Sequence, residues 1–198
     1  MATTIQFWFD FASPYAFIAA KQVQAIAAGG PTQFDWQPFL VGVALRAKTQ
    51  GVSSTQLVTE AEARYRKHDV HRACTRLNLP LRWPSNYPRG SMLAARIAFW
   101  AQGSDWQVPF IDAVFEANFL KDRDIASEDC IRSILTDMAI EPESTIAAAT
   151  GSNQKEAFRI HVETALAAGV FGVPMFAAKD ELFWGHDRLD QALEWATT

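Results

Sequence analysis

The stretch TIQFWFDFASPYA, residues 4–16, joins a strand pattern directly to a helix start. Side chains alternate over residues 4–11 with the period of a β-strand, and both faces of that strand are largely apolar. Ser13 can cap the N-terminus of a helix, and Pro14 fits its first position. We therefore expect a helix over residues 15–28 immediately after the strand.

The rest of the chain divides by its periodicity. Residues 32–39 alternate again and predict a strand with one solvated face, which includes Gln37. Residues 42–168 have helical periodicity almost throughout and no convincing strand. Residues 173–184 predict a β-hairpin, and Asp187 is placed to cap a final helix. The expected order is β-α-β, a helical block, and β-β-α.

Composition narrows the kinds of partner. Hydrophobic residues make up 49% and charged residues 20% of the 198 residues, which is typical of an ordered globular protein. The net charge is −4 and Lys and Arg are scattered, so neither nucleic acid nor a membrane surface is an expected partner. No apolar run of about 18 residues and no signal-peptide pattern is present, which favours a cytoplasmic protein. We expect a small-molecule partner.

Metal and disulfide chemistry find little support in the sequence. Cys74 and Cys130 lie far apart and form no Cys-x-x-Cys pair, so both are expected to be buried apolar residues. His68 and His71 have a spacing that can chelate, but no third ligand follows them. A solvated helix face is the favoured interpretation, and no metal site is predicted.

Three segments resemble a known family. They are FDFASPYA at residues 9–16, FGVP at residues 171–174 and FWGHDRL at residues 183–189. Together they resemble the kappa-class glutathione transferases and 2-hydroxychromene-2-carboxylate isomerase, and in that family serine replaces the first cysteine of the redox pair. The resemblance implies an α/β, thioredoxin-like fold with a large all-helical insertion, as in DsbA-like proteins. It also implies a homodimer.

The same resemblance divides the chain into domains. Residues 1–41 and 169–198 correspond to a discontinuous thioredoxin-like domain, and residues 42–168 to an inserted helical domain. One departure lies in residues 48–55, where family members often carry an asparagine near the ligand and this chain has KTQGVSST. That ligand contact is not transferred.

Ser13 is the candidate catalytic residue. The segment Ser13–Ala16 holds no sulfur and cannot exchange disulfides, so the resemblance implies that glutathione supplies the thiol beside the Ser13 hydroxyl. Lowering a thiol pKa of about 8.5 by two units requires roughly 2.7 kcal/mol. A charge-assisted hydrogen bond contributes about 1.5 to 3 kcal/mol and a helix end up to about 2, which together suffice. The alternative is that Ser13 is only a helix cap.

The remaining glutathione contacts are expected in the tail of the chain. With Pro174 in the cis form, the backbone of Val173 can pair with the cysteinyl unit of glutathione; the alternative is an ordinary trans proline. A pocket at the start of the last helix would consist of Trp184, Gly185, His186 and Asp187. Asp187 would bind the γ-glutamyl amine, or it serves only as a cap.

Two further positions have polar side chains near the expected site. Asn86 and Tyr87 lie on an irregular loop, where the phenol can hold or protonate an oxygen of an aromatic substrate, although Tyr87 is equally an ordinary loop anchor. Asp10 ends the first strand without a second carboxylate nearby in the sequence. We assign Asp10 a structural role, as an acceptor of hydrogen bonds from nearby backbone.

The resemblance implies a glutathione-dependent isomerase acting on a small aromatic carboxylate. It would convert a 2-hydroxychromene-2-carboxylate type substrate to the trans-hydroxybenzylidenepyruvate through a transient glutathione adduct. A kappa-type glutathione transferase or peroxidase would use the same thiolate but consume glutathione, and the sequence does not separate the two. A redox-silent thioredoxin-like module that binds peptides is the third possibility.

Overall fold

A mixed sheet of four strands forms the centre of the computed structural model, which describes residues 4–43 and 58–198. Its strands are β1 (Thr4–Phe9), β2 (Gln33–Pro38), β3 (Met175–Ala178) and β4 (Glu181–Trp184), in the order β2-β1-β3-β4. β1 is parallel to β2 and antiparallel to β3, and β3 is antiparallel to β4. The segment 48–55 lies outside the described residues.

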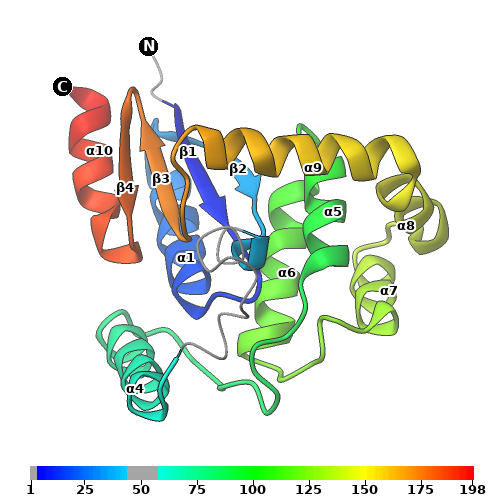
Figure 1. Cartoon of the computed structure of the whole chain (residues 1–198), viewed down its shortest axis with the longest axis horizontal. Coiled ribbons are helices and arrows are strands. Elements are labelled where there is room, and N and C mark those ends of the chain that lie inside the picture. Colours follow the sequence, from blue (N-terminus) through cyan, green and yellow to red (C-terminus); the bar gives the residue numbers. More distant parts are fainter. Residues whose placement is uncertain (1–3, 44–57) are drawn as a thin grey trace.

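Helices account for most of the remaining described chain (Figure 1). α1 (Pro14–Gly29) links the two parallel strands, as the Ser13-Pro14 start predicted. The others are α4 (Glu60–Arg76), α5 (Met92–Trp100), α6 (Gln107–Phe119), α7 (Glu128–Asp137), α8 (Pro142–Thr150), α9 (Ser152–Ala167), the short 3-10 helix η1 (His186–Arg188) and α10 (Leu189–Thr197). This is the expected β-α-β, helical block and β-β-α order.

The two faces of the sheet are covered by different helices. On one face, phenylalanines of β1 and β3 pack against α1, α6 and α10, with the rings of Phe7 and Phe176 stacked at 5.3 Å. On the other face, Trp8 and Met175 pack against α5 and α9. Figure 1 shows α9 crossing the sheet and α10 beside β4. Strands with both faces covered explain the apolar runs in the sequence.

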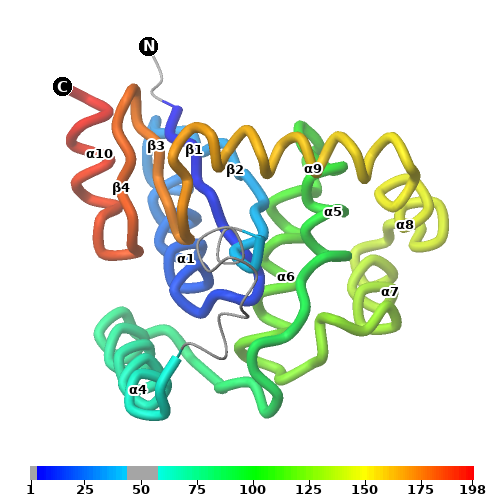
Figure 2. Tube along the Cα trace, viewed as in Figure 1, coloured from blue at the N-terminus to red at the C-terminus, as the bar shows by residue number. Residues whose placement is uncertain are grey.

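One hydrophobic cluster continues from the sheet into the helical block. Phe11 and Phe17 contact Phe115 with ring centroids 5.0 and 6.2 Å apart, and Phe17 contacts Phe119 at 5.3 Å. α4 contributes little to this cluster, because only Val70, Ala73 and Cys74 of its residues are buried. It stands apart from the sheet at the lower left of Figures 1 and 2. The two-domain division stays a prediction.

The solvated position predicted for Gln37 is wrong. This side chain is 8% exposed, and its Oε1 accepts a hydrogen bond from Gln102 Nε2 at 3.0 Å. α5 and α9 cover this end of β2, so the amide is buried but paired. Within the described part of the chain, no helix is long and apolar enough to cross a membrane.

Candidate functional site

The Ser13 turn connects β1 to α1. Ser13 is the N-cap of α1, and its Oγ accepts a hydrogen bond from Ala16 N at 3.2 Å. Its backbone carbonyl accepts the first helical bond from Phe17 N at 3.1 Å. The hydroxyl proton of Ser13 therefore stays available for a ligand, next to the positive end of the helix. The predicted cap is present, and capping leaves a ligand role open.

A buried carboxylate fixes the turn in front of Ser13. Asp10 is 3% exposed, and its two oxygens accept hydrogen bonds from Ala12 N at 2.9 Å, Val41 N at 2.8 Å and Ser91 Oγ at 2.6 Å. Burial raises the pKa of Asp10, while these hydrogen bonds act to lower it. Asp10 thus has the structural role predicted for it. Its bond to Ser91, 81 residues away, was not foreseeable from local sequence.

Val173 and Pro174 lie at the same end of the sheet as Ser13. The pairing of Met175 with Trp8 places them beside the carboxyl end of β1, and the peptide bond between them is cis. The carbonyl of Pro174 accepts a hydrogen bond from Gly185 N at 3.0 Å. Among the residues that the structure describes, the backbone N–H and C=O of Val173 have no hydrogen-bond partner. They remain available for a peptide ligand.

Trp184 ends β4 at this edge of the sheet, and Gly185, His186 and Asp187 follow it. Trp184 is 57% exposed, and its ring meets Phe171 edge-on at 5.1 Å. Trp184 also closes over Gly172, where a Cβ would lie 2.9 Å from its Nε1. Gly185 has φ of +123°, a conformation that favours glycine.

His186 is buried against the helix that Ser13 begins. Its ring stacks on Tyr15 at 5.8 Å with an interplanar angle of 9°. Burial lowers the pKa of His186, and its Nδ1 is buried with no hydrogen-bond partner in the described structure. A buried orphan nitrogen of this kind can pair with a polar group of a ligand.

The capping role predicted for Asp187 is wrong. The structure records no side-chain hydrogen bond at the N-terminus of η1 or of α10. Asp187 is exposed, and its Oδ2 lies 3.5 Å from Arg188 Nη2. The short 3-10 helix separates Asp187 from the start of α10, which explains why sequence spacing misled. The carboxylate therefore faces solvent, accessible to a cationic group.

The predicted loop position of Tyr87 and Asn86 is confirmed. Asn86 is exposed, whereas Tyr87 is 43% exposed and its ring packs on Trp83 at 4.9 Å, which partly covers the phenol. Burial of the phenol raises the pKa of Tyr87, the charge of Arg66 lowers it, and the charge of Asp10 raises it. Trp83 of the same loop contacts Lys67 and His71, so the loop lies beside α4.

Arg89 anchors this loop through a buried ion pair and buried hydrogen bonds. Its side chain is 3% exposed, and its Nη2 lies 2.5 Å from Asp122 Oδ1. Its Nη1 donates to Asn118 Oδ1 at 3.1 Å and to the carbonyl of Arg123 at 2.9 Å. Asn118 Nδ2 in turn donates to the carbonyl of Phe11 at 2.9 Å. A buried polar chain thus runs from the loop to the segment just before Ser13.

α4 approaches the site through contacts with Tyr15 and Trp83. The hydroxyl of Tyr15 donates to Asp69 Oδ2 at 2.9 Å, and the ammonium of Lys67 lies 5.7 Å from the centre of the Trp83 ring. His71 stacks on the same ring at 6.4 Å. Burial, followed by the hydrogen bond to Asp69, raises the pKa of Tyr15. The contacts of Lys67, Asp69 and His71 were not predicted, because nothing local shows which side of α4 faces α1 and the Trp83 loop.

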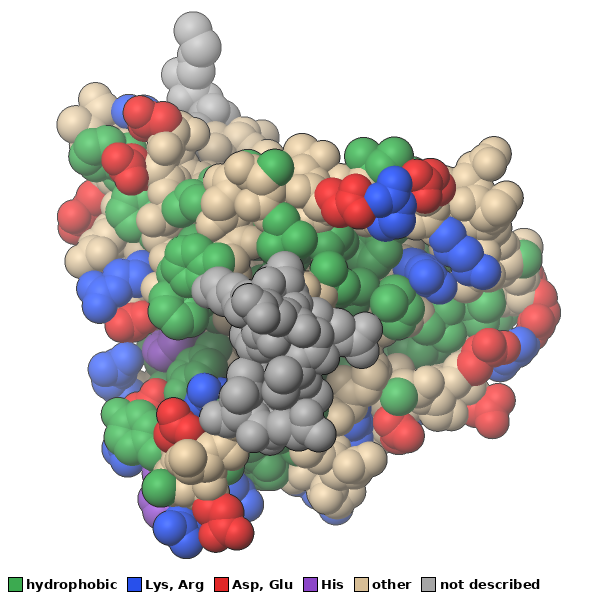
Figure 3. Space-filling view, viewed as in Figure 1, with side chains coloured by type: hydrophobic (Ala, Val, Ile, Leu, Met, Phe, Trp, Pro, Cys, Tyr) green, Lys and Arg blue, Asp and Glu red, His purple; other side chains and the backbone are tan. Residues whose placement is uncertain are grey.

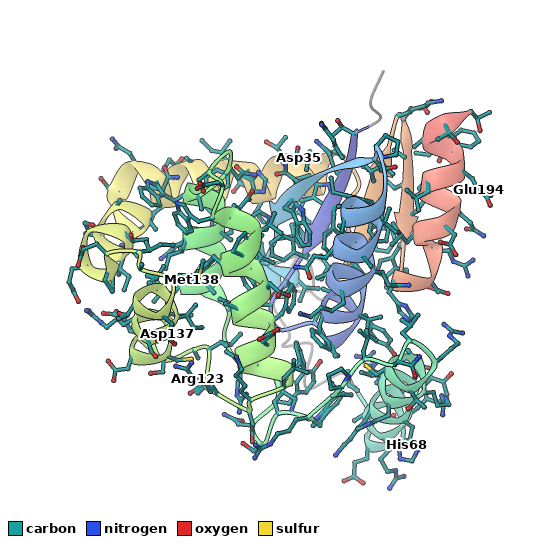
Figure 4. All side chains as sticks on the ribbon, turned by 180° about the vertical axis from the view of Figure 1, so that it is seen from behind. Asp35, His68, Arg123, Asp137, Met138 and Glu194 are labelled. Carbon is teal, nitrogen blue, oxygen red and sulfur yellow. The ribbon has the colours of Figure 1, made fainter. Side chains whose placement is uncertain are left out.

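The outer side of α4 is charged and solvated. Figure 4 shows His68 on α4, and Figure 3 shows acidic and basic side chains mixed over the same region. A shallow depression there is lined by Lys67, His68, His71, Arg72, Thr75 and Arg76. No group of three or more potential metal ligands occurs among residues 4–43 and 58–198.

The fold is that of a thioredoxin-like protein, with Ser13 at the turn between β1 and α1. The chain belongs to the family of the DSBA-like thioredoxin domain, whose model matches residues 4–194. It is 25% identical over 191 residues to a 2-hydroxychromene-2-carboxylate isomerase of Sphingobium xenophagum, covering 96% of each chain. The similarity to proteins of this name supports an enzyme of the isomerase family.

Solved structures agree on the fold. The structure of a 2-hydroxychromene-2-carboxylate isomerase superposes with a TM-score of 0.87 at 21% identity, covering 98% of this chain and 94% of that one. The cytosolic disulfide reductase DsbM of Pseudomonas aeruginosa, solved with GSH, gives a TM-score of 0.61 at 14% identity, covering 98% and 96%. At these identities the likeness establishes the fold alone.

Proposed function

We propose that this chain is a glutathione-dependent isomerase of 2-hydroxychromene-2-carboxylate type substrates. The observation that carries the proposal is the Ser13 turn, where a hydroxyl stands at a helix N-terminus in the place of a redox cysteine. The similarity to isomerases over 96% of the chain supports the reaction class. The disulfide reductase solved with GSH supports glutathione as the cofactor.

The residues present fit glutathione. Its thiolate would accept a hydrogen bond from the Ser13 hydroxyl and face the positive end of α1. The free N–H and C=O of Val173, beside Pro174, would pair with its backbone. Its γ-glutamyl end would lie against Trp184, Gly185, His186 and Asp187, where the buried Nδ1 of His186 lacks a partner and the Asp187 carboxylate is exposed.

Bound glutathione would supply a nucleophilic sulfur, held beside the Ser13 hydroxyl and the N-terminus of α1, and as a cofactor it would not be consumed. The chain contributes the electrostatics: the Ser13 hydroxyl and the helix end favour the thiolate over the thiol. On the loop opposite, the Tyr87 phenol, whose pKa is raised by burial, stays protonated and can donate a hydrogen bond to a substrate oxygen. Asn86, exposed beside it, would contact the same small aromatic carboxylate.

Calorimetry with glutathione and absorbance titration of its thiol test the cofactor assignment. Wild type is expected to bind glutathione and lower its thiol pKa by about two units from about 8.5. Ser13→Ala should keep the fold but shift that pKa back by a unit or more. Ser127→Ala, at the N-cap of α7, is the matched control and should change neither quantity. Absence of binding by wild type would favour a peptide-binding module instead.

Glutathione consumption separates isomerase from transferase. During turnover of 2-hydroxychromene-2-carboxylate the glutathione concentration should stay constant while the product accumulates. Stoichiometric loss of glutathione would instead assign the chain as a kappa-type transferase or peroxidase. A homodimer, proposed from the family resemblance alone, is checked by sedimentation of the purified chain.

A further inference from the structure

The second and third turns of α4 face α1 and the loop that carries Trp83. Two neighbours define its orientation: Asp69 bonds to the Tyr15 hydroxyl at 2.9 Å, and Lys67 lies over the Trp83 ring at 5.7 Å. Tyr15 belongs to the first turn of α1, and Trp83 packs on Tyr87. These turns of α4 therefore span from the α1 side of the site to the loop side.

Helical geometry places Arg66 between these two contacts. At about 100° per residue, Arg66 lies about 60° from Asp69 on one side and about 100° from Lys67 on the other. It is also about 40° from Val70, which is fully buried, so Arg66 continues the inward side of the helix. Arg66 therefore lies on the side of α4 that carries the contacts to Tyr15 and Trp83.

The charge of Arg66 acts on groups of three elements. It acts to lower the pKa of Tyr15 on α1 and of Tyr87 on the loop, and it also acts to lower the pKa of Glu62, one turn earlier on α4. Arg66 itself is exposed and makes no hydrogen bond or ion pair within the described residues. Arg72 of the same helix differs, because its Nη2 pairs with Asp69 at 3.1 Å and its guanidinium lies over the Tyr65 ring at 5.5 Å.

We propose that Arg66 binds the carboxylate of the aromatic substrate and thereby selects acids over neutral analogues. The inference rests on the proposed function and assigns its substrate-binding cation. A guanidinium matches a carboxylate through two parallel hydrogen bonds, which an unpaired arginine can offer without first breaking an ion pair. The Trp83–Tyr87 ring pair beside it supplies an apolar surface for the aromatic part of the same molecule.

Steady-state kinetics of an acid and its ester test this assignment. The substrates are 2-hydroxychromene-2-carboxylate and its methyl ester, and the proteins are wild type, R66Q, R66K and R64Q. For the acid, R66Q should raise KM about 10- to 100-fold with kcat changed less than about threefold, the range of one charge-assisted hydrogen bond. For the ester, KM should stay within about twofold of wild type. R66K, which keeps the charge, should recover part of the loss.

Arg64 provides the matched control. It lies on the same helix about 160° away from Arg66 and is also exposed, so R64Q removes an equal charge from the outer side. R64Q should leave both substrates unchanged. Equal losses for acid and ester in R66Q, or equal losses in R66Q and R64Q, would overturn the proposal.

The glycine or γ-glutamyl carboxylate of glutathione is the other possible source of the anion. Calorimetry distinguishes it, since R66Q should bind glutathione with the affinity of wild type. A glutathione affinity reduced tenfold or more in R66Q would assign Arg66 to the cofactor and overturn the substrate assignment. Failure of the proposed function has a different signature, namely wild-type turnover that does not require glutathione.

Discussion

Arg89 and Arg82 both lie beside the carboxylate of Asp122, and they should differ sharply in how much they contribute to the free energy of unfolding. Arg89 is 3% exposed and lies 2.5 Å from Asp122 Oδ1, whereas Arg82 is 65% exposed and lies 3.5 Å from Asp122 Oδ2. Replacing Arg89 by Met leaves the carbonyls of Asn118 and Arg123 and the Asn118 amide oxygen without their donor. Breaking such a buried network costs about 3 to 5 kcal/mol.

The comparison of R89M with R82M gives the measurement. For a chain of this length each kcal/mol changes the melting temperature by about 2 to 4 °C, so R89M should melt about 6 to 20 °C below wild type. R82M removes an exposed ion pair and should cost at most about 1 kcal/mol. Calorimetric or circular dichroism melting of the three proteins checks this. Equal shifts in R89M and R82M would refute the idea that burial decides the contribution.

Three other outcomes follow from the same structure. In Ser13→Cys the new thiol should have a pKa about one to two units below about 8.5, because it caps a helix; thiolate absorbance measures this pKa. The native thiols do not interfere, because burial raises the pKa of Cys74 to about 11 and also raises the pKa of Cys130. Burial lowers the pKa of His161, so its contribution to the free energy of unfolding should be lost as pH falls below about 6.5, and His161→Phe should flatten that dependence in denaturant melts. Ser91→Ala removes the 2.6 Å bond to Asp10 and should cost about 1 to 3 kcal/mol by urea unfolding, with no loss expected if Asp10 finds another donor.

Local sequence was sufficient to predict the elements but not their partners. Alternation and the Ser13-Pro14 start predicted β1 and α1, because strand period and capping are properties of neighbouring residues. Gln37 was misplaced because its exposure depends on helices far along the chain that cover the end of β2. Capping by Asp187 failed because spacing alone does not reveal a 3-10 turn before α10.

Local sequence was also insufficient to predict all residues of the candidate site. Ser13, Val173 and the Trp184–Asp187 segment were predicted from motifs as ligand-binding residues, and the pairing of β1 with β3 and of β3 with β4 brings them to one end of the sheet. Arg66, Asp69 and Arg89 were not found, since each depends on a long-range contact or on the direction in which a helix faces. Arg66 has Glu62 and Asp69 one turn away on the same helix, so its local sequence does not mark it as an unpaired cation.

The aromatic cluster that runs from Phe9 through Phe115 to Phe119 also limits how the chain can be engineered. A shortened version that fuses residue 41 to residue 169 would strip α6 from the sheet and leave Phe9, Phe11 and Phe17 facing water. Such a truncated protein would expose a contiguous hydrophobic surface and is expected to aggregate on expression. Grafting new loops at the tips of the helices, rather than excising the helices, is therefore the route by which this scaffold can be remodelled.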